Sequence, residues 1–170
     1  MAKHECVRCG ESYQTTIGNY HYLESGLDNL WLCGIETYRC KCGESAAIPQ
    51  PLELHRTIAK CLLMQKSPLS GKEIRFLRKH MAMKAIEFAK RVGVDNATVS
   101  RWENDKENPA DAADRAIRLS CAVRLGYYEE AKQIFEDIFP EIGPNNPRVP
   151  IFIAADRLGR FACVKECDKV

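Results

Sequence analysis

No stretch of the sequence comes near the run of about 18 apolar residues that a membrane-spanning helix requires. The first ten residues hold no apolar segment of the kind found in a signal peptide, and they carry two cysteines instead. The sequence also lacks the His-Glu-x-x-His pattern of zinc hydrolases and any visible nucleophile–base pair. We therefore expect a cytoplasmic protein that neither spans a membrane nor acts as an enzyme.

Charge of one sign is not in large excess, because the formal net charge of the 170 residues is only +2. The charge is unevenly distributed: residues 66–108 carry ten Lys or Arg against six Asp or Glu, whereas residues 1–48 carry four against six. The positive segment has the balance expected of a surface that meets phosphate groups. The hydrophobic content of 45% is that of a folded protein, and the length suits one small and one medium domain.

Nine cysteines are present, and in a reducing compartment they favour metal binding over a disulfide framework. Two close pairs, Cys6 with Cys9 and Cys40 with Cys42, are each followed by a glycine that lets the chain turn over a metal. Between the pairs, two segments of alternating aromatic and branched residues flank a turn-like stretch and predict a β-hairpin. This layout predicts a zinc ribbon in which four thiolates form a closed, structural zinc site.

The membership of the zinc site is open at this stage, because the Cys40–Cys42 spacing is tighter than usual. Cys33, His4 or His21 could replace one of the four thiolates, although Cys33 fits better as a packed strand residue. Two further cysteines near the end, at positions 163 and 167, could form a second metal half-site or a redox pair. We favour the simpler interpretation that they are unrelated.

Residues 70–104 have the pattern of a helix-turn-helix. A capping box at Ser70 and Glu73 begins one helix, and a second short helix is expected over residues 84–92. Gly93 then makes a sharp turn, and Asp95 caps a third helix over 96–104. Val99 and Trp102 are expected in the core. The outward side of this third helix is left with Asn96, Ala97, Thr98 and Arg101, near its N-terminus.

The segment from Val92 to Pro109 resembles the reading segment of the phage-repressor (Cro/CI) type helix-turn-helix, and the resemblance covers residues 70 to about 125. Together with the N-terminal ribbon, it also resembles MqsA-type antitoxins and their YgiT-type zinc-finger relatives. The resemblance implies that the ribbon contacts a toxin, and that the helix-turn-helix dimerises and represses an operon. It implies a base-reading role for Arg101, whereas Ala97 and Ala85 depart from the residues common in such families.

Two more helices are expected over residues 110–125 and 127–139, with Val123 and Phe135 among the apolar residues of their stripes. Such stripes usually face the core, but one or both could instead bury against a second chain, since domains of this kind commonly dimerise. Strands are expected over 150–154 and 160–164. An isolated hairpin is marginally stable in water, so this one should join another sheet, either that of the zinc ribbon or that of a partner subunit.

The predicted fold class is α+β. It comprises a small N-terminal β zinc ribbon (residues 1–48), a linker helix (49–69), an all-α five-helix helix-turn-helix domain (70–139) and a C-terminal extension with a β-hairpin (140–170).

The predicted function is a sequence-specific transcriptional repressor with structural zinc, binding a palindromic operator in double-stranded DNA as a homodimer. Arg101, Asn96 and Thr98 would read bases, while Lys84 and Ser100 would contact phosphates. The alternative is an antitoxin or interaction module whose ribbon neutralises a partner toxin.

Overall fold

The computed structural model describes residues 4–6, 8–13, 15–156 and 159–167. In these ranges strands lie at both ends of the chain and six α-helices lie between them, which confirms the α+β class. The chain forms two compact units. The β unit takes the described residues up to Leu23, Asp28–Thr57 and those from Pro150 onward; the helical unit takes Glu24–Leu27 and Ile58–Val149. No helix among the described residues is long and apolar enough to cross a bilayer.

The β unit begins with the predicted hairpin. Strand β3 (Thr15–His21) pairs antiparallel with β4 (Leu30–Cys40), and β5 (Gly43–Ala46) pairs antiparallel with the end of β4. Two short strands, β1 (His4–Glu5) and β2 (Ser12–Tyr13), form a separate antiparallel pair. The two close cysteine pairs therefore lie at two hairpin turns, one between β1 and β2 and the other between β4 and β5.

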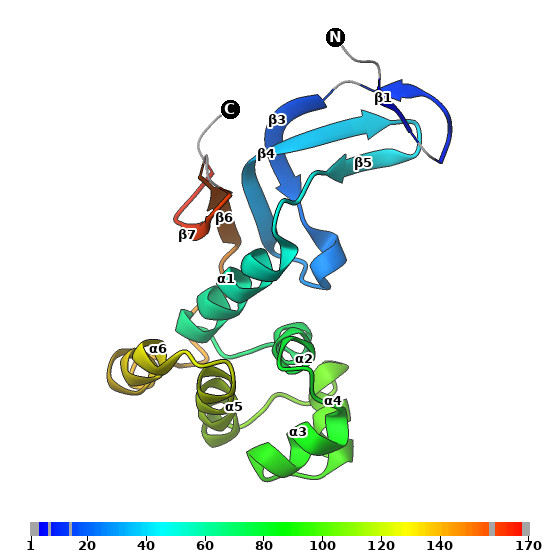
Figure 1. The fold of residues 1–170 in the computed structure, drawn as a ribbon. Helices are drawn as coiled ribbons and strands as arrows, with labels where there is room; N and C mark the ends of the chain where they lie inside the picture. The colour runs from blue at the N-terminus through cyan, green and yellow to red at the C-terminus, as the bar shows by residue number, and fades with distance from the viewer. Residues whose placement is uncertain (1–3, 7, 14, 157–158, 168–170) are drawn as a thin grey trace. The chain divides into compact units, whose positions relative to one another are not determined.

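The C-terminal hairpin, formed by β6 (Ile151–Ala155) and β7 (Phe161–Val164), joins the same sheet as the ribbon strands. Strand β6 lies parallel to β4, with Leu30 opposite Ile151, and the strand order is β3-β4-β6-β7 (Figure 1). Leu30, Leu32, Ile151 and Ile153 are buried along this pairing. The sequence left open whether the hairpin joins the sheet of the zinc ribbon or that of a partner subunit; it joins the sheet of the ribbon in its own chain.

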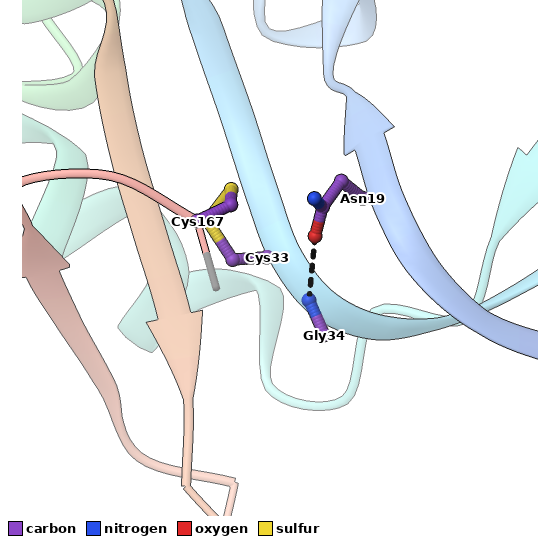
Figure 2. Close-up of a disulfide and its surroundings, with 4 residues drawn as sticks. All are labelled: Asn19, Cys33, Gly34 and Cys167. Atoms are coloured by element: carbon purple, nitrogen blue, oxygen red, sulfur yellow. Dashed lines mark hydrogen bonds between the residues drawn. A yellow bond between two sulfur atoms is a disulfide. The ribbon is translucent and has the colours of Figure 1, made fainter. Parts of the chain in front are cut away.

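Strand β4 changes partner at Gly34. Before this glycine β4 pairs with β6, and after it β4 continues to the segment that pairs with β5. Gly34 has a φ of +63°, a conformation that side-chain-bearing residues rarely adopt. Its N–H donates to Oδ1 of Asn19 at 3.2 Å, so the irregular backbone of β4 is tied to β3 (Figure 2).

A disulfide joins Cys33 of β4 to Cys167, with a Cα–Cα distance of 5.2 Å and a sequence separation of 134 (Figure 2). The expectation that the cysteines form no disulfides is thus wrong, since Cys61 and Cys163 are disulfide-bonded as well. Cys163 and Cys167 are not a redox pair with each other, because Cys167 pairs with Cys33, but neither of them is an incidental free cysteine. Cys33 is buried, as expected, but it is not a simple packed residue. The pairing arises because β6 and β7 return the end of the chain to β4, a long-range contact that cysteine spacing does not reveal.

We predict that replacing Cys167 by serine lowers the free energy of unfolding of the β unit by about 2–4 kcal/mol, because the crosslink closes a long loop of the unfolded chain. Urea denaturation measures the loss. Cys33→Ser should give a similar loss, and the double variant should lose no more than either single variant. A non-reducing digest without a peptide joining positions 33 and 167 would contradict the pairing.

The helical unit contains the second half of α1 (Pro51–Met64) and then five helices and a π-helical turn. These are α2 (Gly71–His80), α3 (Ala85–Val92), α4 (Asn96–Glu103), α5 (Asp111–Arg124), α6 (Tyr128–Gln133) and η2 (Ile134–Ile138). The capping box at Ser70 and Glu73 is present, which confirms the predicted start of α2. The fully buried side chains include Ile74, Leu77, Phe88, Val99 and Ile117.

A charged side chain lies at the centre of this unit. Arg118 of α5 is fully buried and pairs with Asp114 one turn earlier, with 2.5 Å between Nε and Oδ1. Asp114 also accepts the backbone N–H of Leu69 at 2.6 Å, just before α2. The remaining donors of Arg118 go to backbone carbonyls at and after the end of α1, those of Leu62, Leu63, Gln65 and Ser67. The pair therefore joins α1, α2 and α5.

Two residues expected in the core are exposed. Val123 near the end of α5 is 53% exposed, and Phe135 in η2 is 64% exposed. The chain forms a π-turn here, in which the N–H of Phe139 donates to the carbonyl of Ile134. This wider turn buries Ile134, Ile138 and Phe139 and leaves Phe135 outside, so the ordinary helical period mispredicts its direction.

We predict that Arg118→Met lowers the free energy of unfolding of the helical unit by about 3–5 kcal/mol, because Asp114 would remain buried without its counter-charge. Chemical denaturation followed by circular dichroism measures the change. The exposed Arg124 of the same helix provides the control, since Arg124→Met should change stability by less than about 0.5 kcal/mol. Equal effects of the two substitutions would show that the buried pair has no special role.

Candidate functional site

Helices α3 and α4 are joined by the predicted tight turn. Gly93 ends α3 with a φ of +80°, and the N–H of Val94 donates to the carbonyl of Ala89. Asp95 caps α4: its carboxylate accepts the backbone N–H of Thr98 at 2.7 Å and the Thr98 hydroxyl at 2.9 Å. These bonds lower the pKa of Asp95 below its ordinary value, since they favour the charged form. Val99 and Trp102 are buried, so the predicted inward face is confirmed.

A buried carboxylate fixes the end of α4 against α2. Glu103 accepts from Nε of Arg78 at 2.5 Å and from Nη2 of Arg78 at 2.9 Å. Arg75 donates to the backbone carbonyl of Glu103 at 2.9 Å. The Glu103 carboxylate also raises the pKa of Arg78. Basic side chains on a surface helix are usually solvated, but Arg78 is largely buried and neutralises a carboxylate in the helix interface.

A second contact fixes α4 near the start of α2. Asp105 has a φ of +53°, a left-handed conformation, and its side chain accepts the N–H of Gly71 at 3.1 Å. A Cβ at Gly71 would overlap the carbonyl oxygen of Trp102, so only glycine allows this close approach. The orientation of α4 is thus set from α2 at both of these points.

The outer face of α4 presents the residues expected there. Asn96, Ala97, Ser100 and Arg101 are exposed, and Thr98 is partly buried because it bonds the cap. Asn104 donates to the backbone carbonyl of Ser100 at 2.7 Å. The remaining candidate, Lys84, is exposed and lies just before α3 rather than on α4; its N–H donates to Glu87 at 3.0 Å.

Arg101 is held by two neighbours that sequence reasoning did not connect. Its Nε donates to Oε2 of Glu107 at 2.7 Å, and its Nη2 donates to Oγ1 of Thr98 at 2.7 Å. The bond to Glu107 raises the pKa of Arg101. The Thr98 contact follows helical i, i+3 spacing and was within reach of the sequence. Glu107 lies beyond the end of α4, where no periodic pattern indicates which way its side chain points.

Four cysteines form a candidate metal centre in the β unit. The sulfur atoms of Cys6, Cys9, Cys40 and Cys42 all lie within 4.8 Å of one another. A tetrahedral zinc site with Zn–S bonds of about 2.3 Å places its sulfurs about 3.8 Å apart, so the cluster can close on one ion with little movement. The four thiols, with no carboxylate or imidazole among them, suit a soft or borderline cation such as zinc.

The cluster favours different protonation states at different sulfurs. Backbone N–H groups of Arg8 and Cys9 lower the pKa of Cys6 to about 6. The hydrogen bond with Cys9, followed by desolvation, raises the pKa of Cys42 to about 12. Without a metal, four thiolates cannot stay charged so close together. A bound divalent cation would favour all four as thiolates and would release the protons that remain.

Two of the alternative ligands lie elsewhere. The ring of His21 stacks on Trp31 with 4.4 Å between centroids, and its Nε2 bonds the carbonyl of Asp28 at 2.9 Å. Cys33 is in the disulfide with Cys167. The side chain of His4 lies outside the described residues. Among the side chains that the structure describes, the four predicted cysteines are thus the ones brought together.

Comparison with known families matches residues 74–113 to a helix-turn-helix family of the Cro/CI type. The matched segment runs from α2 to the beginning of α5 and contains the whole α3–turn–α4 arrangement. Comparison with curated proteins and with solved structures gives no match. The match supports a DNA-binding regulator, since this family comprises regulatory domains and not enzymes. It does not extend to the ribbon, and the resemblance to MqsA-type proteins is not confirmed.

We predict that Cys6→Ser abolishes high-affinity binding of one zinc ion, because it leaves three thiolates for a four-coordinate site. A chromogenic chelator competition at fixed pH measures the affinity. Cys33→Ser is the matched control: it also removes a cysteine of the β unit but should retain the ion. Loss of zinc from both variants, or from neither, would show that the cluster is not the site.

Proposed function

We propose that the protein is a sequence-specific transcriptional repressor that binds a palindromic operator in double-stranded DNA as a homodimer. The observation that supports this most directly is the fixed orientation of α4, whose inner face is buried and whose outer face carries short polar residues and an arginine. A helix presented in this way fits the major groove of B-DNA, with its N-terminal residues at the base edges. Such a regulator would act in the cytoplasm, where its operator lies.

The side chains of α4 suit distinct roles. Arg101 would contact a guanine, since arginine can bond both O6 and N7 of that base. Asn96 and Thr98 would read neighbouring base edges, and the methyl group of Ala97 would meet the methyl of a thymine. Lys84 and Ser100 would bond phosphates, which position the helix without selecting a sequence.

The basic charge available to DNA is smaller than the sequence suggests. Arg75 and Arg78 are engaged by Glu103, and Arg101 pairs with Glu107. Lys84, Lys90 and Arg91 are exposed on or beside α3, the helix that precedes the reading helix. We therefore assign them, and not the arginines of α2, to the phosphate contacts.

Dimerisation is proposed because one reading helix contacts too few base pairs for tight binding. The helical unit offers exposed apolar side chains after the helix-turn-helix, namely Val123, Tyr128 and Phe135. A second copy that covers them would remove apolar surface from water and place two α4 helices on one operator. Repression would follow from occupation of that operator.

Zinc is the proposed metal, held by Cys6, Cys9, Cys40 and Cys42. It would join the β1–β2 turn to the β4–β5 turn and stabilise a ribbon whose own core is small. Four protein ligands leave no open position for a substrate, so the role is structural.

We predict that Arg101→Ala weakens binding to the selected operator by about 10- to 100-fold, the loss of roughly 1–3 kcal/mol of base discrimination. Genomic fragments bound by the purified wild-type protein would be sequenced, and affinities for the enriched site would then be compared at one salt concentration. Arg56→Ala, which removes an exposed arginine from the β unit, should bind as the wild type does.

Failure of the wild-type protein to enrich any fragment would overturn the repressor proposal. The alternative, a module whose ribbon neutralises a partner toxin, would then be tested by co-purification with the protein encoded beside it. Enrichment that is unchanged in Arg101→Ala would keep DNA binding and remove Arg101 from the reading residues.

A further inference from the structure

The guanidinium of Arg101 is fixed from two directions although its side chain is 45% exposed. Glu107 accepts from Nε on one side, and Thr98 accepts from Nη2 on the other. We propose that Glu107 is a positioning residue for base recognition, which pre-orders Arg101 so that the end of its fork meets one guanine. This inference rests on the proposed DNA-binding function and adds a residue that lies outside the reading helix.

The Thr98 side of the contact has a defined direction. The hydroxyl of Thr98 has one proton, which it donates to Oδ2 of Asp95 at 2.9 Å. Its lone pairs are therefore left to accept from Arg101. Asp95 is in turn fixed by the cap of α4, where Oδ1 accepts the N–H of Thr98 at 2.7 Å. The cap thereby orients Thr98, and Thr98 orients one edge of the guanidinium.

The donors that remain on Arg101 suit a bidentate contact. A guanidinium has five N–H groups, and the bonds to Glu107 and Thr98 occupy that of Nε and one of Nη2. Three N–H groups remain, two on Nη1 and one on Nη2. One N–H from each Nη nitrogen can then form the two parallel bonds to O6 and N7 of guanine.

Glu107 has two opposite effects on DNA binding, and these can be separated. As a negative charge beside the reading helix, it weakens the attraction of the protein to every duplex. By bonding Arg101 before DNA is bound, Glu107 lowers the conformational entropy that this long side chain loses on binding. This raises the affinity only for a duplex with the matching base. An exposed ion pair contributes little to stability by itself, so the positioning effect should appear in discrimination and not in folding.

The test uses full-length protein and a random duplex library, with wild type, Glu107→Gln, Arg101→Ala and the double variant compared at one salt concentration. Glu107→Gln should reduce preference at a single base pair by about 3- to 10-fold, while affinity for non-matching duplex stays equal or rises. In the Arg101→Ala background, Glu107→Gln should not change preference further. Glu136→Gln, which removes an exposed carboxylate of η2, is the charge-matched control and should leave preference unchanged.

A second measurement on the free protein separates this inference from the proposed function. The Nε–Hε signal of Arg101 should show an ordered side chain in the wild type and a mobile one in Glu107→Gln. If Glu107→Gln retains the base preference and binds all duplexes more tightly, Glu107 acts only by charge repulsion, and the proposal is overturned. Equal mobility in both proteins would overturn it too. If the wild type selects no sequence, the proposed function fails, and the positioning role of Glu107 in base recognition fails with it.

Discussion

The buried pair of Arg118 and Asp114 is the interaction on which the helical unit depends. A guanidinium removed from water must find partners for its donors, and Arg118 finds them in one carboxylate and in the carbonyls at and after the end of α1. Those carbonyls would otherwise be left without intrahelical partners. Because Asp114 also holds the N–H of Leu69, the same pair sets where α2 begins. A hydrophobic residue at position 118 could fill the space but could not satisfy these backbone groups.

Helix α4 takes its position from α2, and so indirectly from that pair. Glu103 binds two arginines of α2, and Asp105 binds the N–H of Gly71 at the other end of the same helix. Both contacts are made by residues at or beyond the last turn of α4. At the N-terminal part of α4, the contact that fixes the helix is the Asp95 cap. The outer residues there are therefore available for contacts with another molecule.

Local signals in the sequence predicted much of this arrangement. The capping box at Ser70, the glycine at 93 and the cap at Asp95 each act within a few residues, so the helix-turn-helix could be placed from sequence. The four clustered cysteines could be predicted because close pairs of cysteines followed by glycine are typical of metal-binding turns. The Cys33–Cys167 disulfide and the partners of Arg118 could not be predicted, because they depend on segments that only the tertiary fold brings together.

The cysteines of the β unit divide between two chemistries with opposite requirements. A metal needs the cluster of Cys6, Cys9, Cys40 and Cys42 reduced, whereas Cys33 and Cys167 are joined by oxidation and Cys163 is also disulfide-bonded. A coordinated thiolate is occupied by its metal, and the disulfide gains protection from the burial of Cys33 in the sheet. Each set therefore depends on the fold: the ribbon turns bring four sulfurs within 4.8 Å of one another, and the β6–β7 hairpin returns the chain so that Cys167 bonds Cys33. The cluster lies at the β1–β2 and β4–β5 turns, and Cys33 lies where β4 pairs with β6, so the two sets occupy different parts of one unit.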